Sequence, residues 1–217
     1  SYYLFAIGGI LISVLFFLSQ LPPINLIYLA LGCVVFNTLL LLNLFKNISF
    51  HKYHKKHSHF FLYITLPFIL LLSIPNFINP AKYEIVLAMF IMIWCNDTFA
   101  YLVGKSIGKH KLFERISPKK TIEGFIGGFV FTIIAGIIIA KYLLNTSNLT
   151  IWIGTAVLVS IFATLGDLIQ SRFKRIAGVK DSGKIMPGHG GILDRLDSMI
   201  FVAPFVFLFY QILNYVS

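Results

Sequence analysis

Long apolar stretches recur along this 217-residue chain, and they restrict the folds that it can adopt. A helix needs about 20 consecutive apolar residues to cross the hydrocarbon core of a bilayer. Because stretches near that length appear along the whole chain, a single cleaved signal peptide does not account for them. Hydrophobic residues make up 58% of the chain and charged residues only 12%, too few to solvate a globular surface. The sequence therefore predicts an all-α integral membrane protein.

The apolar pattern indicates a polytopic bundle of about seven transmembrane helices. The predicted spans are residues 3–19, 24–45, 59–75, 83–103, 122–143, 150–170 and 196–215. Lysine and arginine concentrate in three of the loops between them, at residues 46–58, 104–121 and 171–195. Alternating the spans through the bilayer places these loops on one side, and loops rich in Lys and Arg stay in the cytoplasm. We therefore predict a cytoplasmic N-terminus, and we attribute the net charge of +10 to topology rather than to nucleic-acid binding.

Asp167, Ser171 and Lys174 are spaced four and three residues apart at the cytoplasmic end of the sixth predicted span. On a helix this spacing puts a carboxylate, a hydroxyl and an ammonium group on one face. A hard divalent cation prefers such oxygen ligands and often keeps substrate phosphates in its shell, while a lysine offers a positive charge to phosphate. The structural alternative is an ion pair between Asp167 and a loop lysine, because a carboxylate within a span needs a polar partner.

The loop after this span combines glycines with charged side chains. It reads Lys180-Asp181, then Pro187-Gly188-His189-Gly190-Gly191, then Asp194-Arg195-Leu196-Asp197. Glycines before a helix N-terminus let backbone N–H groups approach an anion, and the helix dipole attracts phosphate. Asp194 and Asp197 share one face at the predicted helix start. N-terminal capping explains one of these carboxylates without a ligand, but not both together with Arg195.

A second polar segment ends the fourth predicted span. Small or polar residues recur there at helical spacing, namely Asn96, Ala100 and Gly104. Such a face favours close helix packing or admits a head group, and Asp97 lies next to it. The following loop ends in Lys119 and Lys120, immediately before the fifth predicted span. Paired lysines at a helix start favour phosphate at the membrane surface.

These segments together resemble the CDP-diacylglycerol synthase family, the phosphatidate cytidylyltransferases. The resemblance rests on Ser171 to Arg175, Lys180-Asp181, Pro187 to Gly191 and Asp194 to Asp197 with their spacings, and on the stretches Asn96 to Gly108 and Ser117 to Gly128. It covers roughly residues 85–200, and a chance match to so long a spaced pattern is improbable. It implies transfer of a cytidylyl group from CTP to phosphatidic acid, giving CDP-diacylglycerol and pyrophosphate in phospholipid biosynthesis.

The resemblance also implies a role for individual residues. Those implied as catalytic are Asp167, Ser171, Lys174 and Asp194. Those implied as substrate-binding are Asn96, Asp97, Lys119, Lys120, Arg175, Lys180, Asp181, His189, Gly190, Gly191, Arg195 and Asp197. Asp167 and Asp194 are implied as ligands of Mg²⁺ or another divalent cation, and a monovalent cation such as K⁺ is left open. The expected partners are CTP, phosphatidic acid and membrane lipids, with no nucleic acid and with a homodimer left open.

The same reasoning divides the chain into two parts. Residues 81–217 are expected to form a catalytic transmembrane domain with the cytoplasmic loops 104–121 and 171–195. Residues 1–80 are expected to supply N-terminal transmembrane helices, and their set is left open because family members carry additional spans there. The expected location is the cell membrane, with the active site facing the cytoplasm.

Two alternative functions remain at this point. A CTP-dependent enzyme acting on another membrane lipid phosphate or lipid alcohol would need the same charged groups, because acyl-chain pockets leave no readable motif. A secondary transporter would place its carboxylates near mid-membrane depth between internal repeats. No inverted repeat is visible in this sequence, and its polar residues gather on one side.

Overall fold

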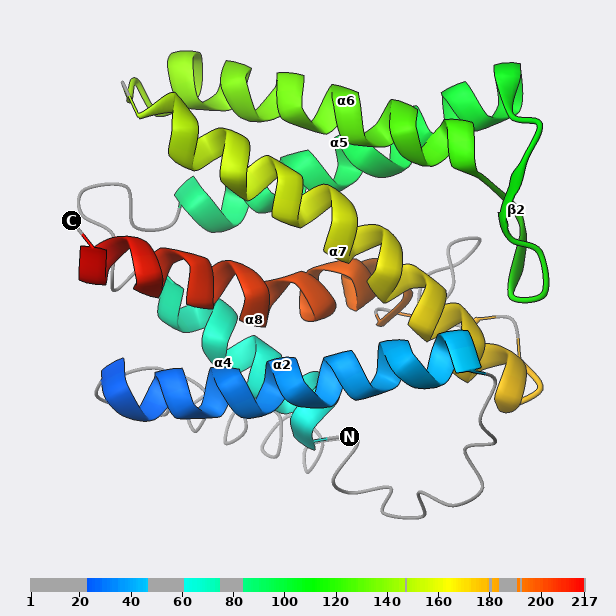
Figure 1. The fold of residues 1–217 in the computed structure, drawn as a ribbon, viewed down its shortest axis with the longest axis horizontal. Coiled ribbons are helices and arrows are strands. Elements are labelled where there is room, and N and C mark those ends of the chain that lie inside the picture. Colours follow the sequence, from blue (N-terminus) through cyan, green and yellow to red (C-terminus); the bar gives the residue numbers. More distant parts are fainter. Residues whose placement is uncertain are drawn as a thin grey trace, which may run out of the picture. The chain divides into compact units, whose positions relative to one another are not determined.

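A computed structural model describes residues 23–46, 61–74, 84–146, 148–179, 181–183, 191 and 193–216. Nearly all of these residues are helical (Figure 1). The helices are α2 (Pro23–Lys46), the π-helical turn η2 (Phe61–Thr65), α4 (Leu66–Ser73), α5 (Glu84–Ile107), α6 (Ile122–Ile138), the π-helical turn η4 (Ile139–Leu143), α7 (Leu149–Ile176) and α8 (Leu193–Val216). Two short strands, β1 (Lys111–Phe113) and β2 (Ser117–Thr121), form a hairpin between α5 and α6.

Five of the described helices are long and apolar enough to cross a membrane. They are Ile24–Phe45, Glu84–Ile107, Ile122–Leu143, Leu149–Ile176 and Leu193–Tyr215. This result confirms the predicted class, an all-α integral membrane protein. The predicted span 3–19 lies outside the described residues, so the count of about seven spans stays a prediction.

Of the span predicted at residues 59–75, the structure describes residues 61–74. The apolar helix there runs from Phe61 to Ser73, which is below the length of a candidate span. Pro67 lies where the π-helical turn η2 passes into α4.

The described chain divides into two compact units. One contains α2, η2, α4 and the part of α8 from Ala203 onward, and the other contains α5, the hairpin, α6, α7 and α8 as far as Val202. Within the first unit, α2 packs on α4 and η2, and the Cys33 thiol donates a hydrogen bond to the Leu62 carbonyl oxygen at 3.2 Å. The polar residues singled out above lie in the second unit.

Helices α5, α6 and α7 lie side by side in the second unit (Figure 1). Small residues allow α5 and α6 to approach closely. A Cβ atom built on Gly124 would lie 2.5 Å from the Ala100 carbonyl oxygen, and one on Gly128 would lie 2.8 Å from the Asn96 carbonyl oxygen. The face of α5 that carries Asn96, Ala100 and Gly104 therefore packs against the start of α6, which was one of the two readings left open by the sequence.

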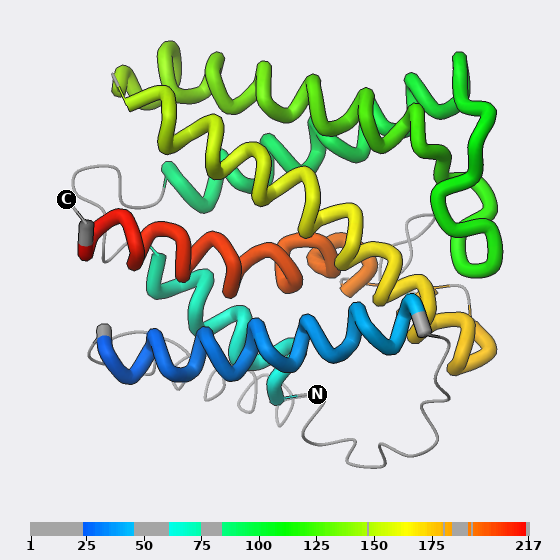
Figure 2. Tube along the Cα trace, viewed as in Figure 1, coloured from blue at the N-terminus to red at the C-terminus, as the bar shows by residue number. Residues whose placement is uncertain are grey.

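The loop predicted at residues 104–121 has regular structure. Helix α5 continues to Ile107, and the hairpin then pairs Lys111 with Thr121 in antiparallel register, with an irregularity before Phe113. Figure 2 shows the chain passing from α5 through this hairpin into α6 at one end of the helix group, and from α6 into α7 at the other end. The loop predicted at 171–195 is also shorter than expected, because α7 continues to Ile176 and α8 begins at Leu193.

The first part of α8 lies directly against α7. A Cβ atom built on Gly166 would lie 2.5 Å from the Phe201 Cβ atom and 3.4 Å from the Asp197 carbonyl oxygen. The rings of Phe162 and Phe201 lie nearby in a tilted arrangement, with centroids 6.3 Å apart. This close approach brings the polar first turns of α8 next to the part of α7 that carries Asp167.

Candidate active site

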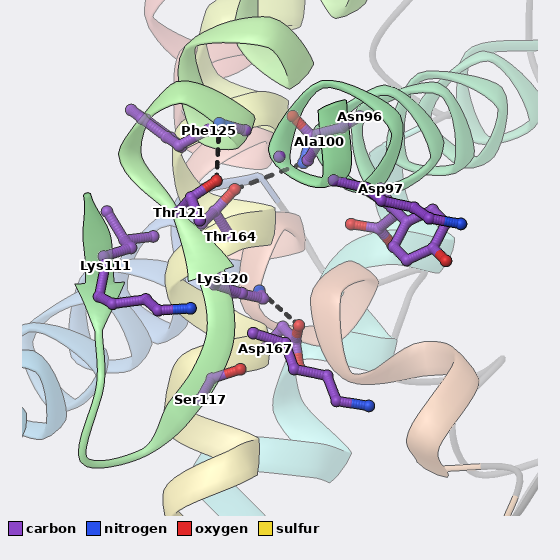
Figure 3. Close-up of a pocket in the computed structure, with 16 residues that line it drawn as sticks. Asn96, Asp97, Ala100, Lys111, Ser117, Lys120, Thr121, Phe125, Thr164 and Asp167 are labelled. Atoms are coloured by element: carbon purple, nitrogen blue, oxygen red, sulfur yellow. Dashed lines mark hydrogen bonds and ion pairs between the residues drawn. The ribbon is translucent and has the colours of Figure 1, made fainter. Parts of the chain in front are cut away.

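A pocket of about 720 Å³ lies where α5, the hairpin, the start of α6 and α7 meet (Figure 3). Its charged lining residues are four lysines and two aspartates, namely Lys105, Lys111, Lys119, Lys120, Asp97 and Asp167. Apolar surface is present as well, from residues such as Leu112 and Phe125. The pocket thus offers a surplus of positive charge beside an apolar wall at the ends of candidate membrane spans, which suits a ligand with both phosphate and lipid parts.

Asp167 is held inside this pocket by two protein donors. The Lys120 ammonium lies 2.5 Å from Asp167 Oδ2, and both side chains keep about a quarter to a third of their surface exposed, 27% and 30%. Ser171, one helical turn further along α7, donates from Oγ to Asp167 Oδ1 at 3.3 Å. Figure 3 shows Lys120 reaching Asp167 from the hairpin. Asp167 therefore does pair with a loop lysine, and it does so at the pocket wall rather than out in the interface.

Lys174 and Asp194 form a second ion pair, between α7 and the start of α8. Lys174 Nζ lies 2.9 Å from Asp194 Oδ1, and the side chains are only 16% and 10% exposed. Asp194 Oδ2 accepts hydrogen bonds from the backbone N–H groups of Ser182 at 2.8 Å and Gly191 at 2.9 Å. Removing one partner of so enclosed a pair would leave a charge without compensation.

Gly191 is required by a close approach of backbones. A Cβ atom built on it would collide with the Ser182 hydroxyl and would lie 2.8 Å from the Gly183 backbone nitrogen. Asp194 holds both segments through its Oδ2 atom. The absence of a side chain at Gly191 therefore lets the two loop segments approach each other around Asp194.

Two further carboxylates lie close to Asp167. The charge of Asp167 acts on both Asp97, which lines the pocket, and Asp197, which is 7% exposed on α8. Neither of them has an ion-pair partner among the described residues. Asp97 and Asp197 are thus carboxylates without an ion pair in the described part of the chain, and a bound cation could compensate them.

The chemistry of this donor set fits a hard divalent cation. A carboxylate offers about four lone-pair positions, and the protein donors on Asp167 use two of them. Within the described ranges, no group of three or more His, Cys, Asp or Glu side chains could hold a metal ion by itself. Mg²⁺ commonly binds one or two carboxylates and completes its shell with water and substrate phosphates. The residues therefore fit a cation that binds together with a phosphate ligand.

Asn96 lies behind the pocket as a hydrogen-bond centre that joins three helices. Its side chain is 1% exposed, and its Oδ1 accepts from Ser160 Oγ on α7 at 2.7 Å and from Thr132 Oγ1 on α6 at 3.4 Å. Its Nδ2 donates to Thr164 Oγ1 on α7 at 3.4 Å. Asn96 lines the pocket, but most of its polar atoms are engaged by the protein.

The remaining residues predicted to bind substrate are spread over several elements. Lys119 lies exposed on β2 and lines the pocket. Exposed positions near the ends of α7 and α8 are occupied by Arg175, Asp181 and Arg195. Three predicted residues lie outside the described part of the chain, namely Lys180, His189 and Gly190.

The pocket also includes residues that the sequence reasoning passed over. Thr164 and the neighbouring Ser160 complete a series of polar residues on α7 at helical spacing, Ser160, Thr164, Asp167, Ser171 and Lys174. That periodicity was present in the sequence and could have identified both hydroxyls. Tyr101, Lys105 and Lys111 also line the pocket. Tyr101 and Lys105 fall in the stretch Asn96 to Gly108 that carries the family resemblance, but they were not selected as site residues, and Lys111 reaches the pocket through the hairpin.

The fold and the site define a polytopic membrane protein with a basic, carboxylate-containing pocket at the ends of its spans. Comparison with protein families matches residues 2–213 to the cytidylyltransferase family. The chain belongs to this family, which confirms the resemblance noted from its motifs.

Curated relatives support the same assignment. A phosphatidate cytidylyltransferase of Staphylococcus aureus (strain COL) is 52% identical over 119 residues, which are 55% of this chain and 46% of that protein. The phosphatidate cytidylyltransferase of Staphylococcus haemolyticus (strain JCSC1435) is 50% identical over 119 residues, with the same coverage of 55% and 46%. The match thus spans about half the length of these curated relatives.

Proposed function

We propose that this chain transfers a cytidylyl group from CTP to phosphatidic acid, giving CDP-diacylglycerol and pyrophosphate at the cytoplasmic face of the cell membrane. The observation that carries the proposal is the Lys120–Asp167 ion pair inside a pocket lined by three further lysines. Family membership and relatives named phosphatidate cytidylyltransferase support the choice of substrates. Residues 81–217 would form the catalytic part, with residues 1–80 supplying further membrane helices.

The proposed reaction needs no protein nucleophile. A phosphate oxygen of phosphatidic acid attacks the α-phosphorus of CTP, and the bond from that phosphorus to the oxygen bridging to the β-phosphate breaks as pyrophosphate leaves. All participants are anions, so bringing them together requires positive charge. The pocket lysines at positions 105, 111 and 119 would seat phosphate oxygens. Apolar residues at the pocket wall would admit the lipid from the cytoplasmic leaflet.

Asp167 and Asp194 would hold a divalent cation such as Mg²⁺, which supplies Lewis-acid polarisation of the phosphate oxygens when bound. Lys120 and Lys174 keep these two carboxylates oriented, and Ser171 adds a hydroxyl beside Asp167. The neighbouring Asp97 and Asp197 would be the candidate ligands of a monovalent cation such as K⁺. Both cation assignments are part of the proposal.

The test is a labelling assay with purified protein in mixed micelles containing Mg²⁺. A cytidylyltransferase moves the α-phosphorus of CTP into lipid, so α-labelled CTP labels the lipid product and γ-labelled CTP labels pyrophosphate only. Phosphatidic acid should be the accepted lipid, with polyprenyl phosphate and diacylglycerol as comparison acceptors. We expect Asp167→Asn and Asp194→Asn to reduce kcat by more than about 100-fold at saturating CTP.

Two outcomes would contradict this proposal. Label from γ-phosphate in the lipid would indicate a kinase, and equal use of polyprenyl phosphate would change the lipid substrate. If the Asp167 and Asp194 variants keep kcat within a few-fold of wild type, each costs about 1 kcal/mol or less of barrier and neither holds an essential cation. Light scattering on the same preparation tests whether the protein is a homodimer, which the sequence left open.

A further inference from the structure

The β1–β2 hairpin carries three of the four pocket lysines, and one carboxylate ties its base to α6. Glu123, in the first turn of α6, accepts the backbone N–H of Lys109 on Oε2 at 3.0 Å. The backbone N–H of His110 donates to both Glu123 oxygens at 3.2 Å, and the His110 ring donates from Nδ1 to Oε1 at 2.7 Å. The carboxylate thus binds two consecutive residues that precede β1.

Neighbouring contacts make the hairpin base a defined structure. The backbone N–H of Ile122 donates to the His110 carbonyl oxygen at 2.9 Å, which continues the strand pairing past Lys111 and Thr121. Thr121 is 6% exposed, and its Oγ1 caps α6 by accepting the Gly124 N–H at 3.1 Å. Glu123 adds its hydrogen bonds to Lys109 and His110 at this junction between the hairpin and α6.

A simpler explanation is that Glu123 only stabilises the α6 dipole or forms a weak surface ion pair. A dipole effect requires no partner in the hairpin, yet both Glu123 oxygens are directed to groups 13 and 14 residues earlier in the chain. The Glu123 side chain is 22% exposed whereas that of His110 is 75% exposed. Backbone N–H groups are also fixed donors, so these bonds restrain the chain itself and not merely a mobile side chain.

We propose that Glu123 is a positioning residue: it anchors the base of the hairpin so that Lys111 and Lys119 face the pocket. Lys111 follows His110 directly, and Lys120 reaches Asp167 from the paired strand. Without the anchor, the hairpin base gains freedom and the lysines spend less time where an anion can meet them. The kinetic part of this inference rests on the proposed function, whereas the anchoring part does not.

Hydrogen exchange measured by mass spectrometry tests the anchor in full-length protein without any substrate. We expect Glu123→Ala to raise amide exchange in peptides covering residues 109–121 and to leave peptides from the middle of α7 unchanged. Glu123→Gln, which keeps one acceptor oxygen, should give an intermediate increase. Glu114→Ala is the matched control, because Glu114 is an exposed carboxylate in the turn of the same hairpin and should not alter exchange at its base.

Steady-state kinetics test the consequence for the pocket. We expect Glu123→Ala to raise KM for CTP about three- to tenfold. Its kcat should stay within about twofold of wild type, because the ion pair with Asp167 holds Lys120 independently of Glu123, and Glu114→Ala should match wild type. Unchanged exchange in Glu123→Ala, or an equal change in the Glu114 control, would overturn the anchor. A fall in kcat at unchanged KM would overturn the positioning of anion-binding lysines. If wild-type protein does not turn over CTP, the proposed function fails, and the exchange data still decide whether Glu123 anchors the hairpin.

Discussion

Lys119 and Lys120 are adjacent on β2 and have the same side chain, but their surroundings differ. Lys119 is exposed at the pocket, whereas Lys120 is partly enclosed and lies 2.5 Å from Asp167. A lysine that seats an incoming anion contributes mainly to substrate binding. A lysine that also compensates a carboxylate within a membrane span controls the charge and orientation of that carboxylate. The sequence alone assigned both lysines to substrate binding. The ion pair with Asp167 gives Lys120 a second role that Lys119 does not have.

We predict that Lys119→Ala raises KM for CTP about two- to fivefold with little change in kcat, whereas Lys120→Ala lowers kcat by more than about tenfold. The reason is that Lys120→Ala leaves Asp167 without its ion-pair partner. Lys120→Arg keeps the positive charge and should recover part of the loss. Steady-state kinetics in mixed micelles measures both constants, and identical effects of the two alanine substitutions would contradict this distinction.

Asn96 illustrates a second effect at the scale of single residues, since its amide serves as an acceptor for side chains on two other helices. Its Oδ1 accepts at 2.7 Å from Ser160, for which no other acceptor is found in the described structure. Thr132 and Thr164 each donate to a carbonyl oxygen of their own helix as well. The Asn96–Ser160 bond is therefore the one whose loss should matter most.

We predict that Asn96→Ala and Ser160→Ala are coupled, with an interaction energy of about 0.6–1.7 kcal/mol, the range found for hydrogen bonds between membrane helices. A double-mutant cycle on the free energy of unfolding, measured by SDS titration in mixed micelles, gives this value. Ser106→Ala is the control partner, because the Ser106 hydroxyl donates only to Leu102 of its own helix. Additive effects for both pairs would show that Asn96 does not couple the helices.

At the scale of whole elements, glycines determine how closely the helices of the second unit approach. Gly124 and Gly128 form a small-residue pair on α6 that meets Ala100 and Asn96 of α5, and Gly166 admits Phe201 of α8 against α7. Membrane helices gain little from hydrophobic association in lipid, so such van der Waals contacts contribute much of their association. The same contacts bring Asp97 on α5 to the pocket that Asp167 on α7 also lines.

We predict that Gly124→Ala lowers the free energy of unfolding by about 1–3 kcal/mol, because the added methyl group would overlap the Ala100 carbonyl oxygen. Gly32→Ala on α2 is the matched control, since a Cβ atom there meets nothing within 4 Å. Alanine has a higher helix propensity than glycine by up to about 1 kcal/mol, so the control should be neutral or more stable. Thermal unfolding in detergent compares the two, and equal destabilisation would contradict close packing at Gly124.

At the scale of the whole molecule, the pocket and the connection between α6 and α7 lie at opposite ends of one candidate span. That span, Ile122–Leu143, has 22 residues and a length of about 33 Å, enough for a hydrocarbon core of about 30 Å. The hairpin precedes it and Asn148 follows it. The basic residues near the hairpin lead us to propose that the pocket end is cytoplasmic.

We predict that Lys109→Cys reacts with a membrane-impermeant maleimide only from the cytoplasmic side of sealed vesicles, and Asn148→Cys only from the other side. The native Cys33 is buried, and Cys95 lies within a candidate span, so neither should contribute strongly. Opening the vesicles with detergent should make both introduced cysteines reactive. Labelling of both from one side would contradict the topology.

The sequence by itself determined the membrane class, the approximate positions of the described long spans and the polar series on α7. These features depend on local composition and helical periodicity, which are visible in one segment at a time. The choice between Lys119 and Lys120 as the partner of Asp167, and the joining of Asn96 to Ser160, were decided only by the tertiary structure. The first depends on where the hairpin lies against α7, and the second on the distance between α5 and α7. The hairpin and its contact with Glu123 could not be predicted from the sequence either. Their hydrogen bonds connect residues 13 and 14 positions apart, in a stretch whose composition indicates only a basic loop.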